Sequence, residues 1–282
     1  MGNDRRMNEP EFNVGATEAL TLRVSAATIC KVILTHPEDG RKMLALERMG
    51  TLANTGTGQS PGVIAKPFGG GIQLRDPEAL RLIIGEFHFD SRRSQKERDF
   101  RILIEPSKWL AVKDFCLRAI QSPGNDMLET SPDRELIEEF QEALTIQLTA
   151  EQYRVKPFSV VIEDKARRTH NLRAPGQPTV RIYQVFEVEI IDPGLVQAII
   201  QNSQVISDQE MAERARIDAQ LGGRGRSNAV LALSLPDLIQ AYLDMDQDAL
   251  DKPVCWEGHW LDGTVPAVLE EIETNKYQRY HF

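Results

Sequence analysis

The segment Arg134-Glu135-Leu136-Ile137-Glu138-Glu139 decides how this chain is interpreted. Apolar residues recur at helical spacing through residues 131–148, which predicts an amphipathic helix. Ser131 is the expected N-cap and Pro132 the expected first helical residue. The polar side carries glutamates three and four residues apart, so their carboxylates are expected to share the other face: Glu135, Glu138, Glu139 and Glu142.

Like charges at this spacing repel, at a cost of roughly 0.2–0.5 kcal/mol for each exposed pair. Arg134 is the only basic residue between Asp133 and Tyr153, so the sequence nearby offers little compensation. A divalent cation would offset the repulsion, because Mg²⁺ binds one or two carboxylates together with substrate phosphates. The alternative is an ordinary solvated face, since glutamate-rich helices are common.

Composition restricts the classes of function. The chain has 282 residues, of which 41% are hydrophobic, and this suits a globular protein with one large domain or two small ones. Its net charge of −9 argues against stable binding to a nucleic acid backbone, but a metal ion could still screen the phosphates of a nucleotide.

The sequence also indicates a compartment. The three cysteines are distant from one another and form neither a disulfide framework nor a Cys-x-x-Cys site. The first thirteen residues lack the apolar core of a secretory signal, and no apolar run is long enough to span a membrane. We therefore expect a cytoplasmic protein without a membrane partner.

Alternation and turn residues predict most of the strands. The expected strands are 21–35 (one strand or a pair), 42–48, 63–65, 100–104, 158–163, 180–191 and 229–233, and the alternation is clearest in 180–191. Residues 54–62, 92–98 and 222–226 are expected to be loops. Residues 1–18 resemble a flexible lead-in.

Helical spacing predicts further helices at 76–85, 106–120, 193–202, 207–221, 234–243 and 265–275. Ser207 and Glu210 form a capping box at the start of one of them. Because strands and helices interleave, we predict a mixed α/β domain over residues 19–245, with a helix–strand–helix insertion at about 74–128. Residues 246–282 are expected to form a C-terminal helical extension that packs on this domain.

A glycine cluster followed by the Arg-Glu-apolar-x-Glu-Glu helix resembles the Nudix hydrolase family. The family pattern is Gly-x5-Glu-x7-Arg-Glu-U-x-Glu-Glu-x-Gly-U, where U is aliphatic, and residues 134–139 match its second half. The glycine turn that precedes this box in the family corresponds here to Pro67 with Gly69, Gly70 and Gly71. The chain also resembles the divergent Nudix domains associated with bacterial nucleotide-second-messenger defence operons, over roughly residues 20–245.

The resemblance implies an α/β/α sandwich with a mixed sheet, often dimeric, and a metal-dependent activity. It implies that Glu138 and Glu139 hold Mg²⁺ or Mn²⁺, that Glu135 is a further ligand or helps to activate water, and that Arg134 orients the glutamates. Gly69, Gly70 and Gly71 would contact the pyrophosphate of a small nucleotide substrate. A basic run that includes Arg168 is a further candidate for phosphate contact, although such runs are usually solvated.

The chain departs from the family pattern in its first half. A gap of 63 residues separates Gly71 from Arg134, and Asp126 stands where the first glutamate of the box belongs. Gln141 replaces the closing glycine, and Gln73 replaces a glutamate that usually follows the turn. Three readings therefore stay open: a pyrophosphohydrolase, an inactive Nudix-like module that binds a nucleotide or a protein, and an unrelated α/β interaction protein.

Overall fold

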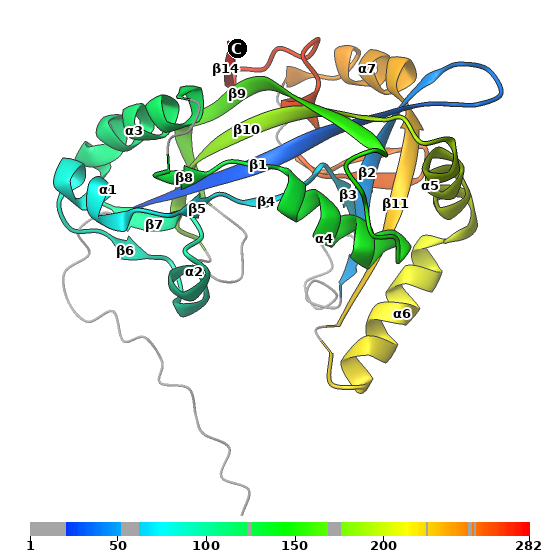
Figure 1. The fold of residues 1–282 in the computed structure, drawn as a ribbon, viewed down its shortest axis with the longest axis horizontal. Coiled ribbons are helices and arrows are strands. Elements are labelled where there is room, and N and C mark those ends of the chain that lie inside the picture. The colour runs from blue at the N-terminus through cyan, green and yellow to red at the C-terminus, as the bar shows by residue number, and fades with distance from the viewer. Residues whose placement is uncertain are drawn as a thin grey trace, which may run out of the picture.

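The computed structural model describes residues 21–51, 62–122, 126–168, 176–223, 225–247, 250 and 252–282. The described strands form one large mixed sheet and a separate two-stranded pair. The 14-residue strand β1 (Leu22–Thr35) runs through the middle of the large sheet (Figure 1). Most of its side chains are buried on both faces, which accounts for its nearly continuous apolar sequence.

The two edges of β1 pair differently. One edge pairs in parallel with β10 (Pro178–Ile190), and the other edge of β10 pairs with the antiparallel strand β9 (Tyr153–Arg168). The other edge pairs in turn with three antiparallel strands, β7 (Arg101–Ile104), β4 (Phe68–Gly71) and β2 (Lys42–Thr51). The glycines of β4 therefore lie against the middle of β1.

Shorter strands extend the sheet. They are β3 (Val63–Lys66) and β11 (Arg226–Ser234) beside β2, β13 (His259–Leu261) beside β3, β12 (Val254–Trp256) beside β13, and β14 (Gln278–His281) beside β9. Strands from the C-terminal part of the chain, β12 and β14, therefore stand first and last in the strand order of the large sheet.

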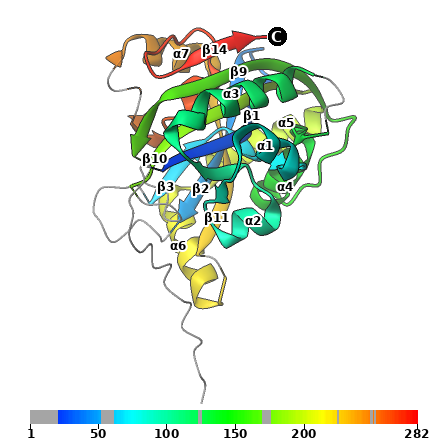
Figure 2. The ribbon, with the colours of Figure 1, turned by 90° about the vertical axis from the view of Figure 1, so that its left-hand side faces the viewer.

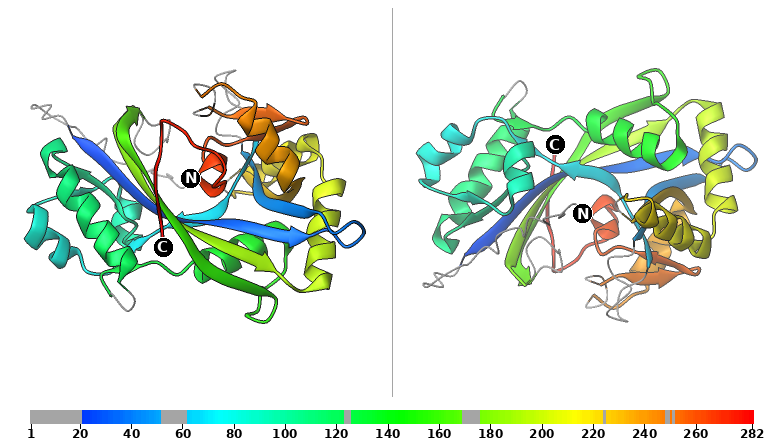
Figure 3. Two further views of the ribbon diagram at one scale, coloured as in Figure 1. Left: turned by 90° about the horizontal axis from the view of Figure 1, so that it is seen from above. Right: turned by 90° about the horizontal axis from the view of Figure 1, so that it is seen from below.

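Helices cover both faces of the sheet (Figure 3). Alternate residues of β1, such as Val24 and Val32, pack with the helices of one face: α1 (Pro77–Ile84), α3 (Trp109–Gln121), α4 (Asp133–Leu144) and α5 (Pro193–Val205). Ile29 and Ile33 point to the opposite face and pack with α7 (Leu235–Leu243) and the short 3₁₀ helix Val265–Val268. Helix α6 (Asp208–Gln220) lies beside β11 and β2. The predicted α/β class, with helical layers on a mixed sheet, is confirmed.

The long segment between β4 and α4 adds β6 and β7 to the main sheet and then returns to its starting point. Strand β5 (Gln73–Leu74) pairs with β8 (Leu128–Glu129), with Leu74 opposite Leu128. Between them lie α1, β6 (His88–Phe89), α2 (Arg92–Glu97), β7, a 3₁₀ turn (Pro106–Lys108) and α3. These elements are gathered at one end of the molecule (Figure 1), and Figure 2 shows that end facing the viewer. The intervening residues therefore enlarge the distance along the chain without separating β4 from α4 in space.

Residues 92–97 and 265–275 differ from the sequence predictions. Residues 92–97 form helix α2 instead of a loop, because Ser91 accepts the Ser94 N–H as an N-cap and Arg93 pairs with Glu97 one turn later. The helix expected at 265–275 is limited to Val265–Val268. Three carbonyl groups that a longer helix would use accept hydrogen bonds from Arg279 instead, those of Pro266, Ala267 and Leu269.

The C-terminal part is therefore not the helical extension that was expected, because its described residues contribute strands β12, β13 and β14 to the main sheet. The predicted lead-in (1–18) and most of the predicted loop at 54–62 lie outside the described residues. Within the described part of the chain, no helix is long and apolar enough to cross a membrane.

Candidate active site

An aromatic contact fixes the glutamate-rich helix against the glycine strand. Phe140 of α4 stacks on Phe68 of β4, with ring centroids 4.7 Å apart, and both side chains are buried. Leu136 and Ala143 continue the same apolar face. The helix begins at Asp133, one residue later than predicted, because Pro132 occupies the N-cap position and Ser131 lies outside it. This packing places the first two turns of α4 beside Gly69 and Gly70.

Glu139 binds the backbone of the glycine strand directly. The Gly69 N–H donates a hydrogen bond of 2.5 Å to Oε2 of Glu139. The other carboxylate oxygen lies 3.6 Å from Nζ of Lys66, which also forms an ion pair of 2.7 Å with Glu47. The side chain of Glu139 is only 13% exposed. Glu139 is thus a buried carboxylate at the edge of β4, not a member of a solvated face.

Glu135 lies one turn earlier and rests on Gly70. A Cβ atom built on Gly70 would lie 1.9 Å from Oε2 of Glu135, so any side chain at position 70 would displace the carboxylate. Oε1 of Glu135 forms a 2.5 Å ion pair with Nη2 of Arg134. Gly70 therefore provides the space that brings the Glu135 carboxylate against the backbone of β4.

Glu138 points away from this site. Its side chain is 59% exposed, and its contact with Arg134 is a 3.6 Å ion pair at the expected i,i+4 spacing. Glu142 is exposed and accepts a hydrogen bond from Asn228. The expectation that four carboxylates share one face is therefore wrong, because Leu136 and Phe140 turn Glu135 and Glu139 inward. Among the described residues, no group of three or more His, Cys, Asp or Glu side chains is arranged to hold a metal ion.

The two inward carboxylates are electrostatically unfavourable without a cation. Burial raises the pKa of Glu139 well above its usual range, and Lys66 and the Gly69 N–H offset this only in part. Burial also raises the pKa of Glu135, despite the adjacent Arg134, and the charges of Glu138 and Asp99 add to the effect. A cation near both groups would favour their charged forms.

The three glycines form a strand, where the sequence predicted a turn. Gly70 and Gly71 lie opposite Thr28 and Ala27 of β1, so their backbone groups belong to the sheet ladder. Gly69 has a φ of +143° and a Cβ there would lie 2.1 Å from the carbonyl oxygen of Thr28, so only glycine fits. Among the described strands β4 pairs with β1 alone, and its second edge faces α4.

Arg168 is not brought to this site. Arg168 is at the end of β9, opposite Pro178, and Pro178 is one residue before the partner of Arg23 on β1. Gly69, in contrast, lies opposite Ile29 of β1, six residues after Arg23. Six residues along a strand correspond to about 20 Å. The rest of the predicted basic run, residues 169–173, lies outside the described residues.

Sequence reasoning missed the polar residues that complete the site. Lys66 and Glu47 lie opposite each other on β3 and β2, and their ion pair supports Glu139. The negative charge of Asp99, from the segment before β7, contributes to the raised pKa of Glu135. Glu47 is a buried charge that follows the apolar run Leu44–Leu46 in β2, and this was the available signal. Asp99 gave none, because the turn that positions it was not predicted.

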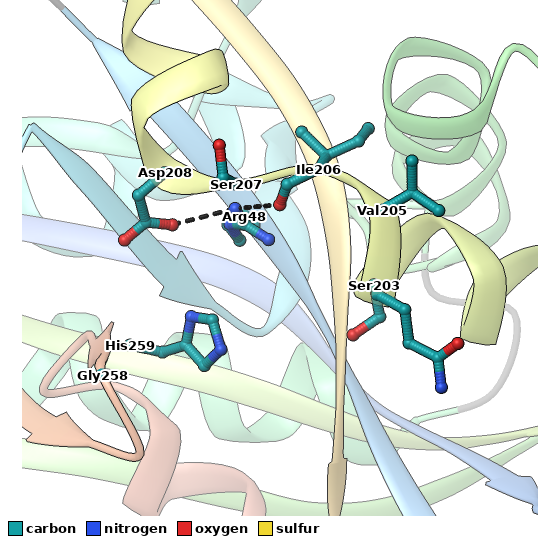
Figure 4. A pocket seen from close by; sticks show the side chains of 9 residues that line it. Arg48, Ser203, Val205, Ile206, Ser207, Asp208, Gly258 and His259 are labelled. Carbon is teal, nitrogen blue, oxygen red and sulfur yellow. Dashed lines mark hydrogen bonds and ion pairs between the residues drawn. The ribbon is translucent and has the colours of Figure 1, made fainter.

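A separate pocket of about 510 Å³ lies where α5 meets α6, opposite the β12–β13 hairpin (Figure 4). Its buried Arg48 forms a 2.9 Å ion pair with Asp208 and also bonds the carbonyl oxygen of Ile206. Burial and the charge of Arg48 lower the pKa of His259 in the same pocket. None of the α4 carboxylates lines this pocket, and Asp208 already balances the charge of Arg48.

Comparison of the chain with known protein families, with curated proteins and with solved structures finds no match. The function is therefore inferred from the geometry at α4 and β4.

Proposed function

We propose that this protein is a divalent-metal-dependent hydrolase that cleaves the pyrophosphate bond of a nucleoside diphosphate linked to another group. One observation carries the proposal: Glu135 and Glu139 lie one helical turn apart, and both carboxylates are held against the backbone of the glycine strand β4. The resemblance of residues 134–139 to the Nudix pattern supports the same reading.

The residues present suit Mg²⁺ or Mn²⁺. Glu135 and Glu139 would hold the ion, because hard cations prefer carboxylate oxygens and Mg²⁺ often takes only one or two from the protein. Burial is the main cause of the raised pKa values of both groups, and neighbouring carboxylates add to it, so a bound cation would favour their charged forms. When bound, the ion would neutralise phosphate charge and lower the pKa of a water molecule. Glu138 points outward and is not assigned to this pair.

The other side chains hold this arrangement in place. Arg134 keeps the Glu135 carboxylate oriented through its 2.5 Å ion pair, and Lys66 keeps a positive charge beside Glu139. Although burial opposes the charge on Lys66, Glu47 and Glu139 raise its pKa above the usual range, so Lys66 remains protonated. A lysine charged in this way can attract the phosphates of a nucleotide.

The experiment that tests this proposal is a hydrolysis screen with Mg²⁺ or Mn²⁺. The compounds are ADP-ribose, NAD, a dinucleoside polyphosphate and a nucleoside triphosphate, which share the pyrophosphate group. Glu139→Gln removes the buried carboxylate, and Glu142→Gln on the exposed side of the same helix is the matched control. We expect turnover of at least one compound by the wild type and Glu142→Gln, and none by Glu139→Gln.

A second candidate is a Nudix-like module that binds a nucleotide or a protein without cleaving it. The outward direction of Glu138 and the ion pair between Lys66 and Glu139 favour this function, because a lysine competes with a metal ion for the carboxylate. In this case nucleotides would raise the melting temperature while Mg²⁺ and Mn²⁺ would leave it unchanged.

A further inference from the structure

A row of polar side chains, two of them arginines, crosses the sheet on the face opposite α4. The row consists of Arg101 on β7, Ser25 on β1 and Arg181 on β10, and Ser25 lies directly opposite both arginines. We propose that this arginine row binds the phosphate groups of an anionic ligand. The nucleotide character of that ligand rests on the proposed function, but binding of the anion does not.

The spacing of the row suits an ion between the two arginines. Neighbouring strands are about 4.8 Å apart, so the Cα atoms of Arg101 and Arg181 lie roughly 10 Å apart across Ser25. Both side chains are partly accessible, at 22% and 23% exposed, and Ser25 is half-buried between them. Arginine presents a planar set of donors that matches phosphate oxygens, and Ser25 adds a hydroxyl.

The small residue Gly71 leaves room for the Arg101 guanidinium and the Asp99 carboxylate. Ala27 and Gly71 lie opposite each other, next to Ser25 and Arg101 on the same face. A Cβ atom on Gly71 would lie 3.4 Å from Nη2 of Arg101 and 3.0 Å from Asp99. The apolar core of this face, formed with α7 and the segment around Val265, includes Ile29 but no residue of β1 before Ala27.

Among the described residues that form ion pairs at the row, the cations outnumber the carboxylates by one. Arg101 pairs with Asp99, Arg181 with Glu163, and the neighbouring Arg23 with Asp90. Lys276 shares the same Glu163 carboxylate, at 3.5 Å, so four cations meet three carboxylates. Burial lowers the pKa of Lys276; the charge of Arg167 adds to this effect, and the charge of Asp262 opposes it. Burial is the main cause of the lowered pKa of Arg23, and the charges of Arg101 and Arg181 add to it while Asp90 opposes it.

Donor groups remain for a ligand. Within the described residues, Arg101 bonds Asp99 through Nη1, while its Nη2 and Nε make no hydrogen bond. Arg181 bonds Glu163 through Nη1 as well. The row also lies close to the candidate active site, because Gly70 meets Glu135 and the next residue, Gly71, lies beside Arg101 and Asp99. Because successive residues of a strand point to opposite faces, the row and the carboxylates lie on opposite faces of β4, and a ligand bound at the row occupies a separate site.

The test inserts a negative charge into the row and compares it with a neutral side chain of nearly the same size. Ser25→Asp places a carboxylate between the arginines, and Ser25→Asn is the neutral control of nearly equal size. Binding of inorganic pyrophosphate and of ADP is measured by calorimetry in EDTA, so that metal binding at α4 does not contribute. Thermal unfolding without ligand reports whether each variant folds, and Arg101→Gln serves as a second variant.

We expect wild type and Ser25→Asn to bind pyrophosphate in EDTA, more weakly as salt rises. Ser25→Asp should bind it at least about tenfold more weakly, and Arg101→Gln should also lose affinity. Glu139→Gln should bind like the wild type, which separates this site from the proposed metal site. Wild-type affinity in folded Ser25→Asp and Arg101→Gln, or no binding of either anion by the wild type, would overturn the proposal whatever the hydrolysis screen shows.

Discussion

The Gly69 N–H donates a hydrogen bond of 2.5 Å to the Glu139 carboxylate, across 70 positions of sequence. This contact joins the glycine strand to the glutamate-rich helix, although the segment α1–α3 separates them along the chain. This hydrogen bond favours the ionised form of Glu139, whereas burial disfavours it. The two parts of the candidate active site are thus one structural unit.

Replacing Glu139 should abolish hydrolysis, whereas replacing Glu138 should reduce it far less. Glu139 is buried against β4, and Glu138 is exposed and reaches only Arg134. Steady-state rates of Glu139→Gln and Glu138→Gln with the best substrate of the screen check this order. Equal loss in both variants would show that Glu138 turns inward when the ligands are bound.

Gly70→Ala should disable the site while most of the fold survives. The new methyl group would collide with the Glu135 carboxylate and displace it, and because this carboxylate is the end of a flexible side chain the free energy of unfolding should fall by less than about 1 kcal/mol. Gly62→Ala is the matched control, because nothing lies within 4 Å of a Cβ at that position. Urea unfolding and hydrolysis rates measure both effects, and wild-type activity in Gly70→Ala would contradict the placement of Glu135.

Phe68→Ala should detach α4 from β4. Loss of a buried phenyl ring that stacks on Phe140 is expected to cost about 3–5 kcal/mol in the free energy of unfolding. Phe68→Leu keeps most of the volume and should cost less than about 1.5 kcal/mol. Urea unfolding distinguishes the two, and similar small costs would show that the aromatic contact does not fix the helix.

The raised pKa of Glu139 predicts a pH dependence of stability. Between the unfolded value, about 4.5, and its raised folded value, Glu139 is protonated in the folded chain and ionised in the unfolded chain. The folded state therefore binds more protons, and stability falls as pH rises through this window. Glu139→Gln lacks this loss, so without metal it should become increasingly stable relative to the wild type from pH 4.5 upward. Melting temperatures across pH 4.5–8 check the trend, and a constant difference would refute it.

The fold class and most elements could be predicted because their signals are local. Alternation indicated β10, and the capping pair Ser207–Glu210 lies at the start of α6, where Ser207 accepts the Glu210 N–H. Helix α2 escaped prediction because its six residues are nearly all polar, and Ser91 with the Arg93–Glu97 pair defines it. The C-terminal strands depend on distant partners in β3 and β9, which a local pattern does not reveal.

The candidate site was only partly predictable for the same reason. The helical spacing identified the glutamates, but it did not show that Phe140 turns Glu139 inward while Glu138 stays exposed. The arginine row depends on register among three strands, so Ser25 gave no signal of its own.

Direct titration of Mn²⁺ into the metal-free protein, followed by electron paramagnetic resonance, tests the central claim that Glu135 and Glu139 hold a divalent cation. The wild type and Glu142→Gln should both remove free Mn²⁺ from solution and release it to excess Mg²⁺, whereas Glu135→Gln and Glu139→Gln should not. Unchanged Mn²⁺ binding in folded Glu135→Gln and Glu139→Gln, or none in the wild type, would contradict the account.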